Sequence, residues 1–126
     1  MKETLAVFIL EDEALIRMMI VQMLEELGHR VVAEAGCISA ALPLAETADC
    51  DLALLDINVG GDDSGDVASA IERRRLPLLF VSGYNSTGLP EPFQGRPVLQ
   101  KPFTIRSLKM AIERTMSVGP PLSPAP

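Results

Sequence analysis

Short apolar runs alternate with segments of helical periodicity along the chain. Strand-like runs are Leu5–Leu10, Arg30–Glu34, Asp51–Leu55, Leu76–Val81 and Pro97–Gln100. Helical spacing is found in Glu13–Leu27, Ser39–Ala48, Asp66–Arg75 and a last segment that Thr104 caps and that extends to about Ser117. Because this alternation is typical of βαβ units, the sequence predicts an α/β fold with a doubly wound, five-stranded parallel sheet.

Gly and Pro interrupt this pattern at three places. Pro43 lies in the second helix, where we expect it in the first turn. Between residues 83 and 97, two Gly and two Pro residues favour a loop, so the fourth helix is expected to be short or missing. The Pro-rich residues 119–126 are expected to be a disordered tail, which leaves residues 1–118 as one domain.

The charge balance argues against a nucleic-acid partner. The chain of 126 residues has 17 acidic residues and 11 Lys and Arg, for a formal net charge of -6. It shows neither a signal-peptide pattern nor an apolar run long enough to span a bilayer. Cys37 and Cys50 have no metal-binding spacing and are expected at the two ends of one helix as reduced thiols. We therefore expect a cytoplasmic protein with no membrane partner.

Polar side chains follow four of the five predicted strands. They are Glu11, Asp12 and Glu13 after the first strand, Asp56 after the third, Ser82 after the fourth and Lys101 after the fifth. In an open parallel sheet the carboxyl ends of the strands form the ligand site, so these residues should converge on one crevice.

Clustered carboxylates repel one another unless a cation lies among them, and hard oxygen ligands suit Mg²⁺, with Mn²⁺ as an alternative ion. A metal held by Asp12 and Asp56 can bind an incoming phosphoryl oxygen, which makes Asp56 a candidate nucleophile. Lys101 and the Ser82 hydroxyl would contact the other phosphoryl oxygens. Glu13 is more simply explained as a first-turn acid of its helix.

The ordered set Glu11-Asp12-Glu13, Leu54-Leu55-Asp56, Ser82-Gly83 and Lys101-Pro102-Phe103 resembles the receiver domains of response regulators, over about Thr4 to Ser117. The resemblance implies a flavodoxin-like receiver fold, a metal-binding acidic pair at Glu11 and Asp12, and phosphorylation of Asp56. It also implies that the backbone carbonyl of Asn58 binds the metal and that the Lys101–Pro102 peptide bond is cis.

Two positions depart from the common receiver pattern. Val98 stands where most receivers have the aromatic switch residue, and Phe80-Val81-Ser82-Gly83-Tyr84 resembles the Phe-Ala-Thr-Gly-aromatic stretch of single-domain alphaproteobacterial receivers. Tyr84 is therefore the candidate replacement for the switch. The resemblance links this subgroup to histidine kinases of the HWE and related classes and to general stress signalling.

The first helix has more apolar residues than one core-facing stripe needs. Ile16, Met19, Ile20, Met23 and Leu27 supply the predicted stripe, and Leu15, Met18 and Val21 remain outside it. In the family that this chain resembles, this helix docks on the helical bundle that carries the phosphohistidine. Scattered surface apolarity explains these residues equally well.

The sequence thus favours a stand-alone phosphoacceptor receiver that takes its phosphoryl group from a histidine kinase or histidine phosphotransfer protein. It would catalyse its own phosphorylation and dephosphorylation, and signal through an unknown downstream protein or act as a phosphate sink. A phosphorylation-independent interaction module on the same fold is the alternative, which Val98 keeps open. A hydrolase is a third reading, because Asp56-Ile57-Asn58-Val59 resembles an aspartyl-phosphatase motif, but Asn58 replaces its second acid.

Overall fold

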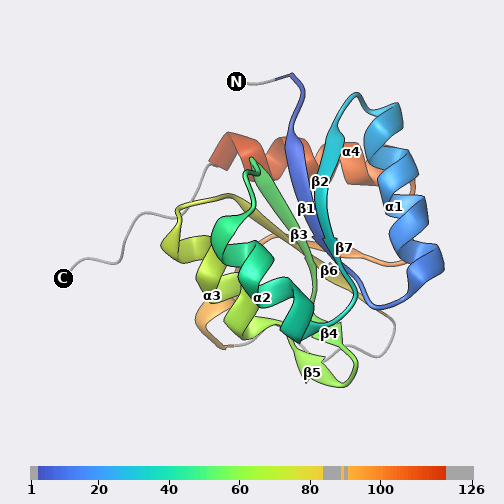
Figure 1. Cartoon of the computed structure of the whole chain (residues 1–126). Coiled ribbons are helices and arrows are strands. Elements are labelled where there is room, and N and C mark those ends of the chain that lie inside the picture. Colours follow the sequence, from blue (N-terminus) through green and yellow to red (C-terminus); the bar gives the residue numbers. More distant parts are fainter. Residues whose placement is uncertain (1–2, 84–88, 90, 119–126) are drawn as a thin grey trace.

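Five parallel strands form the central sheet of the protein (Figure 1). The structure is a computed structural model that describes residues 3–83, 89 and 91–118. In chain order the strands of this sheet are β1 (Ala6–Leu10), β2 (Arg30–Ala35), β3 (Leu52–Asp56), β6 (Leu78–Ser82) and β7 (Val98–Gln100). Their spatial order is β2-β1-β3-β6-β7. Strand β2 is added on one side of β1 and the later strands on the other side, so the strand order reverses between β1 and β3. This arrangement confirms the predicted five-stranded parallel sheet.

Helices cover both faces of the sheet (Figure 1). They are α1 (Ala14–Glu26), α2 (Ile38–Thr47), α3 (Gly65–Arg73) and α4 (Ile105–Val118), and the turn η1 (Glu91–Phe93) is a 3₁₀ helix. Alternate side chains of β1 face opposite layers: Val7 and Ile9 pack with residues of α1 and α4, whereas Phe8 and Leu10 pack with residues of α2 and α3. The fold is therefore doubly wound, as the alternating pattern predicts.

The described part of the connection between β6 and β7 contains little regular structure, in line with its Gly and Pro content. Within the described part of this connection, η1 is the only helical element. Phe93 of η1 packs against Phe80 of β6 with ring centroids 5.6 Å apart, and Arg96 lies over the Phe93 ring and pairs with Glu72 of α3. These contacts fix η1 against α3 and β6 where a longer helix was not expected.

Two local predictions need correction. Pro43 lies in the interior of α2, because the helix begins at Ile38, and not in its first turn. Cys37 precedes α2 as predicted, but Cys50 lies beyond the helix end at Thr47 and is buried just before β3. Both thiols are free, as expected.

The predicted cap of the last helix is confirmed. Thr104 caps α4 through its hydroxyl oxygen, which accepts the Ser107 N–H at 3.1 Å.

Among the helices of the described ranges, none combines the length and the apolar character that crossing a bilayer requires.

The end of α3 contains a residue in an unfavourable backbone conformation. Arg75 has φ of 60°, and Leu76 N–H donates to Ile71 O in the pattern of a Schellman motif, where glycine is usual. Because a side chain in the left-handed region costs about 1 kcal/mol, we expect Arg75→Gly to be more stable than Arg75→Ala by about 1 kcal/mol. Urea unfolding of the two variants tests this, since both lack the arginine side chain. Equal stabilities would contradict the assigned conformation.

Candidate functional site

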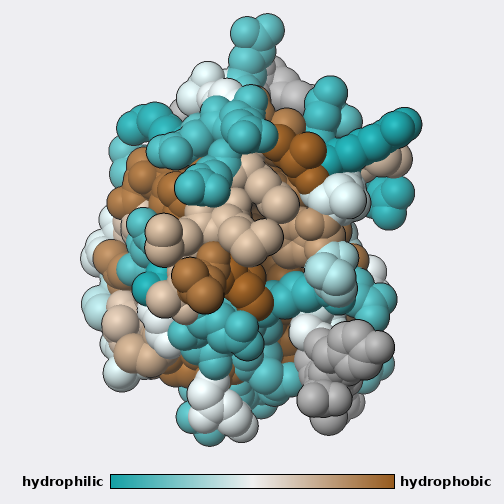
Figure 2. All heavy atoms as spheres, turned by 90° about the vertical axis from the view of Figure 1, so that its right-hand side faces the viewer, coloured by the Kyte–Doolittle hydropathy of each residue, from teal (hydrophilic) through white to brown (hydrophobic). Residues whose placement is uncertain are grey.

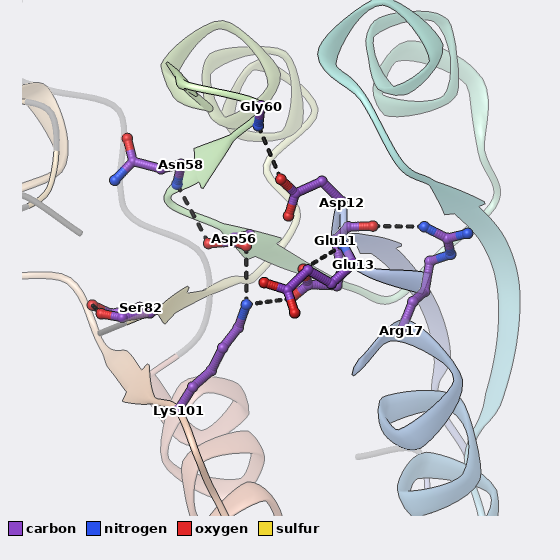
Figure 3. Close-up of polar contacts among 10 residues, drawn as sticks. Glu11, Asp12, Glu13, Arg17, Asp56, Asn58, Gly60, Ser82 and Lys101 are labelled. Atoms are coloured by element: carbon purple, nitrogen blue, oxygen red, sulfur yellow. Dashed lines mark hydrogen bonds and ion pairs between the residues drawn. The ribbon is translucent and has the colours of Figure 1, made fainter. Parts of the chain in front are cut away.

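The polar residues predicted at the strand ends gather at one edge of the sheet (Figure 3). Glu11 directly follows β1, Asp56 ends β3, Ser82 ends β6 and Lys101 directly follows β7. Neighbouring parallel strands bring these ends together even though the residues are separated by up to ninety positions in sequence. The predicted convergence on one crevice is therefore present, with Ser82 at the margin of the group.

Lys101 joins the two buried acids of this site. Its Nζ lies 3.1 Å from Asp56 Oδ2 and 2.5 Å from Glu11 Oε1, and all three side chains are largely removed from solvent. The Lys101–Pro102 peptide bond is cis, as the family resemblance implied. Glu11 Oε1 is buried, and no donor among the described residues is aligned with it for a hydrogen bond, so the contact with Lys101 is an ion pair.

Carboxylate oxygens of Glu11, Asp12 and Asp56 lie within 4.8 Å of one another. With Lys101, the ionised group carries more negative than positive charge, and two of its acids are buried. A buried excess of negative charge is costly without a counterion. Three carboxylates that offer hard oxygen ligands to one point are the donor set that suits Mg²⁺ or Mn²⁺. The residues present therefore fit such a cation.

The surroundings shift the proton affinity of each group. Burial raises the pKa of the Glu11 and Asp56 carboxyls above their ordinary values, and the contacts with Lys101 offset this only in part. Burial acts to lower the pKa of Lys101, but its bonds to Glu11 and Asp56 outweigh burial and raise it. Desolvation is also the largest single influence on Asp12, yet the hydrogen bond from Gly60 N–H and smaller contributions together lower its pKa.

A small hairpin after β3 holds Asp12. Strands β4 (Asn58–Val59) and β5 (Asp62–Asp63) pair antiparallel around Gly60 and Gly61, whose φ values of 60° and 91° fit a tight two-residue turn. Gly60 N–H donates to Asp12 Oδ2 at 3.0 Å. Neither the hairpin nor its contact with Asp12 was predicted from the sequence.

Asn58 presents its backbone to the site. Ser64 N–H donates to Ile57 O at 2.9 Å, and hydrogen-bonded and non-hydrogen-bonded pairs alternate along an antiparallel hairpin. The backbone groups of Asn58 therefore point outward from the hairpin, and its N–H donates to Asp56 Oδ1 at 3.4 Å. Its carbonyl is not needed by the hairpin pairing and is available to a ligand.

Ser82, Val98 and Tyr84, the three positions that concern the predicted switch and its hydroxyl partner, lie away from the acids or outside the described residues. The Ser82 hydroxyl donates to Gly83 O at 3.3 Å, and the residue lies apart from the three acids and Lys101 in Figure 3. Val98, at the position of the usual aromatic switch, is half exposed on β7. Tyr84, the predicted replacement for that switch, lies outside the described residues.

The predicted apolar stripe of α1 was wrong in part. Met19, assigned to the core, is 53% exposed, whereas Leu24, which that stripe omitted, is fully buried. Leu15 and Met18 are exposed as predicted, and Val21 is half-buried and packs against the core. Figure 2, which views the molecule from the α1 side, shows apolar side chains gathered across this face.

A hollow of about 420 Å³ adjoins this face of α1. Its walls come from α1 and from the segment after β7, and include Ile16, Met19, Met23, Lys101 and Phe103. The hollow thus joins the exposed apolar side of α1 to the lysine of the site.

The chain matches the response regulator receiver domain family over residues 7–113. Among curated proteins, the transcriptional regulatory protein PdtaR of Mycobacterium tuberculosis is 38% identical over 115 residues, which cover 88% of this chain and 56% of the relative. The nitrate/nitrite response regulator protein NarP of Escherichia coli is 41% identical over 85 residues, covering 64% of this chain and 40% of the relative. The chain thus spans about half the length, or less, of these curated relatives.

Solved structures with the same architecture include SdrG from Sphingomonas melonis Fr1, with a TM-score of 0.82 and 36% identity over 92% of this chain and 99% of that chain. The response regulator PhyR from Brucella abortus has a TM-score of 0.75 and 28% identity, covering 91% of this chain and 49% of that chain.

Proposed function

The chain belongs to the response regulator receiver domain family, and on that premise we propose that it accepts a phosphoryl group on Asp56 from a histidine kinase or histidine phosphotransfer protein. The observation that carries the proposal is the placement of Lys101 Nζ against Asp56 and Glu11, beside a third carboxylate, in one crevice. This is the set of charges that a carboxylate nucleophile and a phosphoryl group require together.

The Asp56 carboxylate is the nucleophile of the transfer. One of its oxygens forms a bond to phosphorus while the bond between phosphorus and the imidazole nitrogen of the donor breaks, and the donor histidine keeps that electron pair. Lys101, already 3.1 Å from Asp56 Oδ2, neutralises one phosphoryl oxygen of the product. Ser82 supplies a hydrogen bond after its hydroxyl rotates away from Gly83 O. Attack of water on the same phosphorus returns Asp56 to its carboxylate form.

Glu11, Asp12, Asp56 and the backbone carbonyl of Asn58 would hold a Mg²⁺ ion. When bound, the ion offsets the repulsion between the anionic donor and the carboxylates. The chain itself prepares this role by gathering the acids, by holding Asp12 through Gly60, and by leaving Asn58 O outside the hairpin pairing.

A phosphorylation assay tests the proposal. Incubation with acetyl phosphate and Mg²⁺ should add one phosphoryl group to the intact mass, and EDTA or the Asp56→Asn substitution should prevent the gain. No gain in mass with a folded, Mg²⁺-loaded protein would favour the alternative, an interaction module that works without phosphorylation. The downstream output, as a signal to a partner protein or as a phosphate sink, follows only after this step.

The exposed apolar side of α1 is the proposed docking surface for the phosphodonor. Leu15 and Met18 are exposed on α1, and Met19, which is also exposed, lines the hollow together with Lys101. Met19 therefore takes the place of the more buried Val21 in this surface. A helical bundle carrying a phosphohistidine could cover these side chains while its imidazole reaches the acid crevice.

Met18→Glu should lower kcat/KM for phosphotransfer from a histidine kinase by about tenfold, because a charge placed in a buried contact costs at least 1 kcal/mol. Phosphorylation by acetyl phosphate should stay unchanged, since the crevice is untouched. Met110→Glu on α4 is the matched control, because Met110 is exposed to a similar extent. If both variants reduce transfer equally, α1 is not the specific docking surface.

A further inference from the structure

Arg17 connects α1 to the loop that carries the acids (Figure 3). Its Nη1 donates to the backbone carbonyl of Glu11 at 2.7 Å, and its Nε pairs with Glu34 Oε1 of β2 at 3.4 Å. The side chain is only 25% exposed. One guanidinium therefore links the acidic loop, α1 and the end of β2.

The contact with Glu11 O is the stronger of the two. It is short, and a charged donor forms a stronger bond to a carbonyl than a neutral one does. The pair with Glu34 is longer and its acid is nearly half exposed, so by itself it would contribute little. A surface ion pair alone does not account for this placement of the guanidinium.

Gly36, just after β2, makes room for the guanidinium. A Cβ at this position would lie 2.9 Å from Arg17 Nη1. The Gly36 backbone is not in the left-handed region, so its conformation does not require glycine. The space occupied by Arg17 is the constraint that the structure shows at this position.

The contacts of Glu11 converge on one orientation of its side chain. Its N–H donates to Ala35 O at 3.0 Å, its carbonyl accepts from Arg17, and its Oε2 accepts the Glu13 N–H at 3.0 Å. Because the peptide is fixed on both sides, the direction of the side chain toward Lys101 is fixed as well. Releasing the carbonyl would free the peptide that joins Glu11 to Asp12.

We propose that Arg17 is a positioning residue for the cation site: it holds the Glu11–Asp12 peptide so that both carboxylates face Asp56, and Gly36 is small in order to admit its guanidinium. This inference rests on the proposed metal-dependent function. Partners behind the ligands of a metal site typically change its affinity by about tenfold or more, and we expect an effect of that size.

Mg²⁺ titrations followed by amide NMR shifts test the inference without reference to activity. Relative to wild type, Arg17→Ala should raise the Kd for Mg²⁺ by about tenfold. It should also change the chemical shifts of the Glu11 to Glu13 amides in the metal-free protein. Arg17→Lys should recover only part of the affinity. The guanidinium of arginine is a planar fork that contacts Glu11 O and Glu34 together, and a single ammonium cannot reach both. Arg73→Ala, which removes an exposed charge from the end of α3, should leave the Kd unchanged.

Gly36→Ala provides a second variant that keeps the charge. It should weaken Mg²⁺ binding in the wild-type background and have no further effect in the Arg17→Ala background, because both changes release the same carbonyl. Additive effects would show that Gly36 acts independently of Arg17, and full recovery of affinity by Arg17→Lys would show that the positive charge alone is needed; either result would overturn the positioning role. Unchanged Kd values in Arg17→Ala and Gly36→Ala would overturn the inference. Failure of wild type to bind Mg²⁺ at all would instead overturn the proposed function.

Discussion

Replacing Asp56 with Asn should stabilise the metal-free protein at neutral pH while abolishing phosphoryl uptake. Burial raises the pKa of Asp56, so its ionised form costs the folded state free energy. Asparagine removes that charge, and Lys101 is not left unpaired because Glu11 remains its partner. Urea unfolding in EDTA measures the gain. Asp49→Asn, which removes an exposed aspartate, should show no comparable gain.

The pH dependence of this gain has a defined sign. An acid with a raised folded-state pKa contributes its full stability below the ordinary pKa, and loses that contribution as the pH rises through the raised value. The difference between Asp56→Asn and wild type should therefore shrink as the pH is lowered from neutral toward the ordinary aspartate pKa. A difference that grows on acidification would show that Asp56 stabilises the metal-free fold.

Replacing Lys101 with Met should destabilise the metal-free protein, and by more than Asp56→Asn stabilises it. The buried Glu11 and Asp56 carboxylates would lose the ammonium between them, and breaking a buried pair in this way costs about 3 kcal/mol. The loss should diminish in acid, where the raised pKa values of both acids let them become neutral. Mg²⁺ should restore part of the stability, because it supplies positive charge to the same oxygens.

Thermal or urea unfolding of Lys101→Met at neutral and acidic pH, with and without Mg²⁺, measures these effects. Lys109→Met removes an exposed lysine from α4 and serves as the control for net charge. A loss of stability that is the same at both pH values would mean that the lysine contributes by packing, and not by compensating the acids.

The fold and the family could be predicted because the signals were redundant. A fully buried strand such as β3 needs a continuous apolar run, and Asp56 at its end is recognisable only because the other strand ends carry matching polar residues. The similarity to SdrG and PhyR agrees with the predicted subgroup. The prediction of a short or missing fourth helix followed from the Gly and Pro content before β7 for the same reason, and the described part of that connection contains only the 3₁₀ helix η1.

The side-chain contacts of the site could not be predicted, because they depend on how elements that are distant in sequence pack together. The first helix is apolar around most of its circumference, so spacing alone did not decide whether Met19 or Leu24 faces the sheet. Adjacent glycines such as Gly60 and Gly61 favour a turn, but the contact of Gly60 with Asp12 across 48 positions depends on where the hairpin lies in the fold. Nothing in the sequence distinguishes Arg17 from other polar helix residues, and only the structure shows its hydrogen bond to Glu11 O.

One cation and one phosphoryl group are proposed to share the crevice formed by three carboxylates and Lys101. A crystal structure of the protein with Mg²⁺ and beryllofluoride would show both ligands at once. We expect a metal about 2.1 Å from oxygens of Asp12 and Asp56, with beryllium bonded to Asp56 and a fluorine within hydrogen-bond reach of Lys101 Nζ. A metal bound elsewhere, or beryllofluoride absent from Asp56 in a crystal that holds Mg²⁺, would contradict it.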